Sequence, residues 1–523
     1  MRGLRWISGG CAALMILLHA TPWQMPARAD VDLVPLPVDV NDVARPDPLI
    51  RSSGRRADSP TALEDVLASL HRHAPVVAAA LLRADSAAGR QLAAQGAFDT
   101  RVSGRAHGRM SGFYDGKVIE SEISRRVAPM NATVFAQYNI SDGTFPVYED
   151  EWATLSGGEA RLGVSMSLLR NRAIDPARLA LVQARTNMAE VRGELAMTLA
   201  ALDAAAVRAY ADWLFTVRAE AVYRDLLTLA EKRQKALANS IKQGQQARIS
   251  LRENRQLLLS RSALVTRAHR DRIAAEERLA LYFRDKAGRP TLPRFQGDLY
   301  LPDAALDPIA ANPDELVQLA LNIRPDLQAI SARMAAARAE LDAADNHMLP
   351  RLDLKTYAAR DFGNGSPTRA QTDTVVSLTF SVPLERRAAR GAVREADAKL
   401  RQLRHQRRWL GDQVSAAIRE ARATIHAAAT RLALRQEEVK VTQELVDVEQ
   451  TRLRNGASDF FRINLAEANF ANARIKALRA RAALDKAYGT LIELLGDRQA
   501  VFDDAAPKTS SGADTDPRET ATD

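Results

Sequence analysis

The sequence predicts a mainly α-helical fold with a small β part, built from two copies of one structural unit. Two long stretches, near residues 176–240 and 384–453, consist mostly of strong helix formers. Short stretches that alternate between apolar and polar residues precede each of them, as expected of strands. Gly244 recurs as Gly456, 212 positions later, and the register holds through the whole long helix, which indicates an internal two-fold repeat.

The first 29 residues predict a secretory signal. Two arginines precede an apolar run, and the small residues Ala27 and Ala29 suit cleavage before Asp30. Cleavage removes three arginines and no acid, so the formal net charge falls from +9 to +6. The only cysteine, Cys11, lies inside this segment, which predicts a mature protein without disulfides.

The rest of the chain divides at two proline-rich stretches. We expect a proline-rich N-terminal segment that forms no core, two repeats separated by a linker, and a disordered polar tail. These segments cover, in order, residues 30–60, 61–287, 288–313, 314–497 and 498–523. No run of about 18 apolar residues follows the signal, so no membrane-spanning helix is expected. No basic cluster is interleaved with aromatic residues, which argues against a nucleic-acid partner.

Each repeat has the same predicted order of elements. A short alanine-rich helix, near 63–95 in the first repeat and 325–348 in the second, is followed by two strands, a long helix, a turn at glycine and a shorter returning helix. Each long helix has a length of about 100 Å at 1.5 Å per residue. This length exceeds that of an ordinary globular domain.

The second long helix carries two apolar series. The first recurs every seven residues, as in a coiled-coil seam, at Ile418, Ile425, Leu432, Val439, Val446 and Leu453. The second series, Leu434, Val441 and Val448, lies about 200° around the helix. Two nearly opposite seams predict a helix that packs against neighbours on both sides. A plain two-stranded coiled coil remains the alternative, because alanines blur the seams of the first long helix.

The strands predict a sheet with one apolar and one polar face. We expect four strands per chain, near residues 98–112, 160–169, 351–361 and 374–382. In the last of these, Val376, Leu378 and Phe380 alternate with serines and threonine. In the first, Arg101, Arg105 and Arg109 share the polar face, so this face is basic if it lines a lumen. A soluble sheet with its arginines outward is the competing interpretation.

Four strands cannot close a membrane barrel, and lipid does not tolerate an open sheet edge. Three chains of four strands would give 12 strands, an even number within the outer-membrane range. Two chains would give 8 strands and leave little lumen. The strands therefore predict a homotrimer with a 12-stranded β-barrel in contact with outer-membrane lipid. Residues 113–157 are expected to form an extracellular loop with an extra strand possible near 133–140.

Several stretches match a known family in order. They are RPDLQAISARMAAARAELDAADNHMLPRLDL (324–354), VSLTFSVPL, RLRNGASDFFRINLAEANFANA (452–473) and YGTLIELLG (488–496). Across residues 60–497 the chain resembles the TolC-like outer-membrane efflux protein family. The resemblance implies a trimer in the bacterial outer membrane, with a large periplasmic part in which the long coiled-coil helices form an α-helical tunnel joined to the barrel. It also implies a passive exit duct of a tripartite efflux or type I secretion system, opened by an inner-membrane pump and a periplasmic adaptor, with no cofactor.

The resemblance also assigns places to particular residues. Pro383 would mark the strand-to-helix join, where the chain passes from barrel to tunnel. The turns at Gly244 and Gly456 would be the periplasmic tips that close the mouth. The expected tip and gate residues are Lys242, Gly244, Arg248, Leu453, Arg454, Gly456, Asp459, Arg462 and Glu467.

The tips are rich in basic residues, which repel one another when they crowd around one axis. We therefore expect ion pairs with Asp459, Glu449 and Glu467 to hold the closed mouth. An ordinary helix cap or a solvated surface carboxylate is the alternative for any one of these acids. The chain has Arg462 where many relatives carry an acid, so the resemblance does not imply an acidic ring at the mouth.

Two other classes of protein are alternatives to an outer-membrane channel. An enzyme has little support, because His71 and His73 point to opposite sides of a predicted helix and no HExxH or phosphate-binding glycine loop is present. No catalytic, cofactor-binding or metal-binding residue is therefore expected. A periplasmic coiled-coil structural or adaptor protein without a channel fits the helices, but it leaves the two-faced strands unexplained.

Overall fold

The computed structural model describes residues 60–128, 131–243, 247–296 and 312–496. The predicted signal, nearly all of the N-terminal segment, the predicted tail and most of the linker lie outside these residues, as does Gly244. Among the described residues, no helix combines the length and apolar character that crossing a membrane requires.

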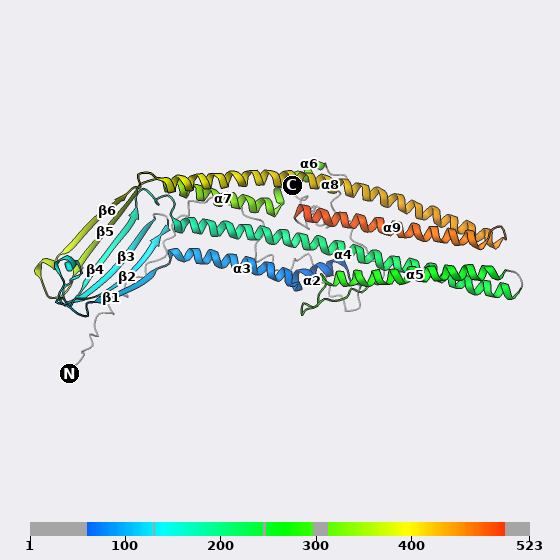
Figure 1. Cartoon of the computed structure of the whole chain (residues 1–523), viewed down its shortest axis with the longest axis horizontal. Coiled ribbons are helices and arrows are strands. Elements are labelled where there is room, and N and C mark those ends of the chain that lie inside the picture. Colours follow the sequence, from blue (N-terminus) through cyan, green and yellow to red (C-terminus); the bar gives the residue numbers. More distant parts are fainter. Residues whose placement is uncertain (1–59, 129–130, 244–246, 297–311, 497–523) are drawn as a thin grey trace, which may run out of the picture. The chain divides into compact units, whose positions relative to one another are not determined.

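Both repeats contain the predicted series of elements (Figure 1). The first comprises α2 (Leu63–His73), α3 (Pro75–Gln95), η1 (Gly96–Phe98), β1 (Arg101–Gly108), β2 (Lys117–Val127), β3 (Ala132–Asp142), η3 (Val147–Trp152), β4 (Glu159–Ser167), α4 (Pro176–Lys242) and α5 (Arg248–Ala280). The second comprises α6 (Pro313–Ile323), α7 (Pro325–Asn346), β5 (Arg351–Asp361), η4 (Pro367–Arg369), β6 (Thr372–Ser381), α8 (Arg387–Arg454) and α9 (Phe460–Leu495). The two predicted long helices are confirmed, since α4 has 67 residues and α8 has 68.

The sheet has six strands rather than four. The order is β1-β2-β3-β4-β5-β6, and every neighbouring pair is antiparallel. All four predicted strands are present, and the possible strand near 133–140 is confirmed as β3. Residues 113–157, expected to form a loop with one possible strand, contain a second strand as well, because β2 pairs with β3 in a hairpin. Acidic residues at alternate positions of β2 obscured its apolar series, Ile119 and Ile123.

The join between β6 and α8 differs from the direct passage that the sequence suggested. β6 ends at Ser381 and α8 begins at Arg387, so Pro383 lies in a short connection and does not start the helix. Arg386, the residue before the helix, has a positive φ of 51°. The chain bends at Leu384 and Glu385, and the left-handed Arg386 then leads into the helix.

The long helices pack through one of the two predicted seams. Ile418 and Ile425 are fully buried in a core that also includes Tyr210, Trp213 and Leu491. This core joins residues of α2, α4, α6, α8 and α9. The second seam is different, because its residues are about half exposed or more, at 68% for Leu434, 47% for Val441 and 49% for Val448. Within one chain, α8 is therefore covered on one side only.

Candidate functional site

The first candidate surface is the apolar face of the six-stranded sheet. Residues paired across antiparallel strands share a face, and successive residues alternate between faces. The apolar side chains that are more than half exposed on one face are Val102, Ile119, Leu162, Val376, Leu378 and Phe380. Charged residues on this face stand only near strand ends, at Lys117, Arg125, Asp142 and Arg360. Soluble monomers rarely expose so continuous an apolar surface.

The opposite face of the sheet is polar and carries balanced charge. Its basic residues are Arg101, Arg105, Arg126, Arg161, Arg351 and Lys355. Its acidic residues are Glu120, Glu122, Glu159, Asp353, Asp361 and Asp373. Each set has six members, so the basic character expected for the polar face of β1 does not extend over the whole sheet. The acids of β2 lie beside the arginines of β1, and Arg105 Nη1 lies 3.7 Å from Glu120 Oε2.

Arg109, the third predicted lumen residue, follows the end of β1. Its guanidinium donates to Glu149 Oε1 at 2.6 Å. Glu149 belongs to η3, between β3 and β4. The three arginines thus lie along one edge of the polar face, but Arg109 faces an acid from a distant segment and not an open lumen wall.

The second candidate site is the turn between α8 and α9. Gly456 has a φ of +72° and its amide donates to the carbonyl of Leu453 at 3.1 Å, while the amide of Ala457 donates to Arg452 at 2.8 Å. This geometry ends α8 and favours glycine. Asp459 Oδ1 then accepts from the amide of Arg462 at 2.8 Å and caps α9. Asp459 therefore acts as a helix cap within the chain, the alternative that the sequence left open.

The charged side chains of this turn are mostly exposed. Arg454 and Arg462 are exposed, Leu453 is half-buried, and across the first turn Lys242 ends α4 while Arg248 begins α5, both exposed. Besides Asp459, the acid Glu449 has partners: it accepts from Ser458 Oγ at 2.6 Å and from Arg452 at 3.1 Å. The Ser458 hydroxyl and the Arg452 guanidinium lower the pKa of the Glu449 carboxyl.

Glu467 lies in the helical wall and not at the tip. It is eight residues beyond Asp459 on α9, or about 12 Å along the helix. The side chain is only 4% exposed and accepts two hydrogen bonds from Arg233 of α4, at 2.7 and 3.1 Å. Arg261 of α5 lies 3.7 Å from it and donates to the carbonyl of Leu226 at 2.7 Å. Burial lowers the pKa of the Arg261 guanidinium.

Sequence reasoning missed Arg233 and Arg261. Both lie on long helices rich in arginine, most of which are exposed, so their residue types gave no signal. The signal that was available is position. Arg261 lies seven residues before Ala268 and three after Leu258, both buried, which places it on the inward stripe of α5.

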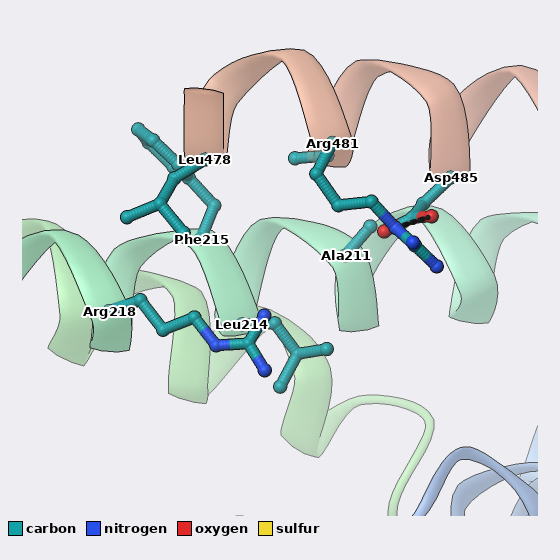
Figure 2. A pocket seen from close by; sticks show the side chains of 8 residues that line it. Ala211, Leu214, Phe215, Arg218, Leu478, Arg481 and Asp485 are labelled. Carbon is teal, nitrogen blue, oxygen red and sulfur yellow. Dashed lines mark hydrogen bonds and ion pairs between the residues drawn. The ribbon is translucent and has the colours of Figure 1, made fainter. Parts of the chain in front are cut away.

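A small hollow lies between α4 and α9 (Figure 2). Leu214 and Phe215 of α4 and Leu478 of α9 line it. At its edge, Arg481 Nε donates to Asp485 Oδ1 at 2.9 Å. The charges at the hollow thus pair with each other.

Comparison with known proteins agrees with this architecture. The model of the outer membrane efflux protein family matches residues 316–497. No curated protein matches the sequence. Three solved structures are similar in fold. The open state of the Neisseria gonorrhoeae MtrE outer membrane channel is 15% identical, covers 83% of this chain and 89% of its own, and gives a TM-score of 0.58.

The outer membrane protein VceC of Vibrio cholerae is also 15% identical, with 84% of this chain and 99% of its own covered and a TM-score of 0.57. The Campylobacter jejuni CmeC outer membrane channel is 11% identical, and the match covers 87% of this chain and 91% of that channel's chain, with a TM-score of 0.57. At these identities the likeness establishes the fold, and the family match covers the second repeat. The family matched over the second repeat, the outer membrane efflux proteins, is the one that the sequence resembles.

Proposed function

We propose that three copies of this chain form the outer-membrane exit duct of a tripartite efflux or type I secretion system. The observation that carries the proposal is the exposed apolar face of the sheet, opposite a polar face of balanced charge. Outer-membrane barrels have this arrangement, with lipid against the apolar face and water inside. The duct is passive and catalyses no reaction.

Closure of the sheet requires other chains. Within one chain β1 and β6 are the two edges of the sheet, and neither has a partner strand among the described residues. An edge strand in lipid leaves unpaired backbone groups, which is strongly unfavourable. Three chains of six strands would supply 18 strands, in place of the 12 expected from four strands each. In the helical part, the exposed seam Leu434, Val441 and Val448 would pack against a neighbouring copy.

The helix turns are the proposed periplasmic gate. Lys242, Arg248, Arg454 and Arg462 bring only positive charge to the turns, and repulsion between copies would open a mouth built from them. Two acids at the turn would offset it: Asp459, which caps α9, and Glu449, which Ser458 and Arg452 hold in place. An inner-membrane pump and a periplasmic adaptor would open the mouth by moving these turns apart.

The proposal is tested on detergent-extracted, unheated protein. We expect the mass of a trimer, retention in envelopes after urea extraction, and ion conductance when the protein is inserted into planar bilayers. A monomeric mass together with urea extraction would instead identify a periplasmic coiled-coil or adaptor protein.

A further inference from the structure

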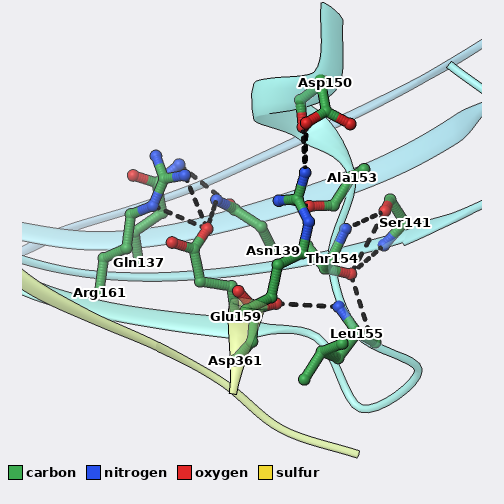
Figure 3. Close-up of polar contacts among 11 residues, drawn as sticks. Gln137, Asn139, Ser141, Asp150, Ala153, Thr154, Leu155, Glu159, Arg161 and Asp361 are labelled. Carbon is green, nitrogen blue, oxygen red and sulfur yellow. Dashed lines mark hydrogen bonds and ion pairs between the residues drawn. The ribbon is translucent and has the colours of Figure 1, made fainter. Parts of the chain in front are cut away.

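The segment that joins β3 to β4, residues 143–158, folds back over the polar face of the sheet; we call it the strap. Ser141 of β3 and Thr154 of the strap exchange two hydrogen bonds, with each backbone amide donating to the other side chain, at 3.1 and 2.8 Å. The amide of Leu155 donates to Asp361 Oδ1 at 2.9 Å, and Leu155 is only 4% exposed (Figure 3). Ser141 and Asp361 both lie on the polar face, so the strap lies on that side of the sheet.

The strap is also tied to the loop between β5 and β6. Arg369 donates to the carbonyls of Ala153 and Asp150 at 2.6 and 3.0 Å and to the Asp150 carboxylate at 2.7 Å. Ser156 and Asn364 exchange two further hydrogen bonds, at 3.1 and 2.8 Å. These contacts join two loops that a simple up-and-down sheet would leave independent.

The middle of the strap, η3, reaches β1. The ring of Trp152 packs edge-on against His107, with 4.3 Å between ring centroids. Glu149 accepts from Arg109 just beyond β1 at 2.6 Å. The strap is thus anchored on β1, β3 and β5. Four strand spacings of about 4.8 Å separate β1 from β5, so the strap crosses about 19 Å of the sheet.

We propose that the strap is a size-determining constriction at the outer mouth of the channel, fixed in place by Arg369, Asp361 and the contacts to β1. This inference rests on the proposed function, in which the polar face lines the lumen. Barrel diameter grows with strand number, so the added β2–β3 hairpin widens the lumen by about half relative to a 12-stranded barrel. The strap occupies part of this added width at the end of the sheet away from the long helices.

The anchors of the strap hold it in one fixed position. Its anchors include a buried backbone amide, two reciprocal hydrogen-bonded pairs and an arginine that holds three acceptors. At Gly157, a side-chain carbon would meet the carbonyl oxygen of Phe362 at 2.6 Å, so the close approach of the two loops requires glycine there. A segment with so many anchors sets a fixed size limit for cargo and does not act as a freely moving lid.

The test uses the whole chain in intact cells and two cysteine reporters. Ser377 lies on the polar face of β6, five residues from Thr372 and about 17 Å below the strap end of the strand. Ser366 lies in the exposed β5–β6 loop. Ser377→Cys and Ser366→Cys are each labelled from outside with a small sulfonated maleimide and with a maleimide on a long polyethylene glycol chain. Cells with the native chain give the background.

We expect the small reagent to label both reporters and the large reagent to label only Ser366→Cys. Adding Arg369→Ala should allow the large reagent to reach Ser377→Cys, and replacement of Val147–Trp152 by a glycine-serine linker should do so fully. Arg351→Ala is the matched control, since Arg351 is on the same polar face but pairs with Asp353 at the other end of β5. It should leave labelling unchanged.

The possible results distinguish failure of the proposed constriction from failure of the proposed exit-duct function. If the large reagent labels Ser377→Cys as strongly as Ser366→Cys while the strap is unaltered, the strap is not a constriction. Continued exclusion of that reagent in both strap variants, with normal trimer yield, overturns the constriction as well. Failure of even the small reagent to label Ser366→Cys would place the loops away from the cell exterior and overturn the proposed function itself.

Discussion

Glu467 of α9 and Arg233 of α4 form a buried ion pair, with 2.7 Å between Oε1 and Nη2, inside the helical wall. Removing one partner of a buried pair leaves an uncompensated charge, which typically costs about 3–5 kcal/mol. We expect Glu467→Gln to lower the free energy of unfolding by this order, measured by thermal or denaturant unfolding in detergent. Glu437→Gln is the matched control, because the Glu437–Lys440 pair is well exposed and should contribute at most about 1 kcal/mol. Equal effects of the two substitutions would contradict a structural role for the buried pair.

Glu220 should make the helical part sensitive to acid. The carboxylate is 2% exposed; burial raises its pKa, but hydrogen bonds from His269 and Arg272 outweigh burial, and the net pKa is lower than usual. A lowered pKa stabilises the fold above the ordinary glutamate value of 4.5, and this stability is lost as the pH falls below that value through the lowered one. We expect Glu220→Gln to be less stable at neutral pH and to show a flatter pH profile in the acid range. Thermal unfolding measured across that range checks both, and an unchanged profile would refute the assignment.

Gly456 and Gly391 offer a matched pair of glycine substitutions. Gly456 has a φ of +72°, so Gly456→Ala should strain the turn and cost about 1 kcal/mol. Gly391 lies inside α8 with nothing within 4 Å of an added side-chain carbon, so Gly391→Ala should stabilise the helix by up to about 1 kcal/mol. Opposite shifts in thermal midpoint are the expected result. A midpoint of Gly456→Ala equal to or above that of the native protein would show that the turn does not depend on a left-handed glycine.

Asp459 should behave as a helix cap. Asparagine caps nearly as well as aspartate, whereas alanine loses about 1 kcal/mol. We expect Asp459→Asn to keep the stability of the native protein and Asp459→Ala to lower it, with closed-state bilayer conductance unchanged in Asp459→Asn. Increased conductance in Asp459→Asn at normal trimer yield would show instead that its charge closes the mouth.

The exposed seam of α8 should be needed for assembly. Val441 is 47% exposed in the single chain and is expected to pack against a neighbouring copy. Val441→Glu should reduce the trimer fraction on unheated gels because it places a charge in an apolar contact. Ala433→Glu, at an exposed position outside both apolar series of the same helix, is the control. Full trimer yield in both variants would remove the seam from the interface.

The sequence predicted the long helices and the strand β6 well because their periodicities are long or strict. Ile418 and Ile425 repeat at seven residues and are fully buried, while Val376, Leu378 and Phe380 alternate without interruption. β2 escaped prediction because both of its faces carry polar residues, and its acids are explained only by the arginines of β1 beside them. Which strands lie next to each other is a property of the tertiary structure, and the sequence of a single segment does not show it.

The candidate site was predicted less well for a related reason. Glu467 was assigned to the mouth from its distance to Gly456 along the chain, yet the side chain turns inward to Arg233. Pro383 was assigned to the strand-to-helix join, but the positive φ in this connection belongs to Arg386, a residue type that seldom adopts it. Residue type alone does not reveal which side chain faces a buried partner or which residue carries a rare backbone conformation.

The balance of six basic and six acidic residues on the polar face of the sheet has an electrical consequence. Opposite charges that alternate over neighbouring strands cancel beyond a few ångströms, since physiological salt screens over about 8 Å. A passage walled in this way has little mean potential, so it neither concentrates nor expels ions of one sign. Anionic, cationic and neutral molecules meet similar electrostatic barriers there, and discrimination by charge falls to the parts of the system that load the cargo.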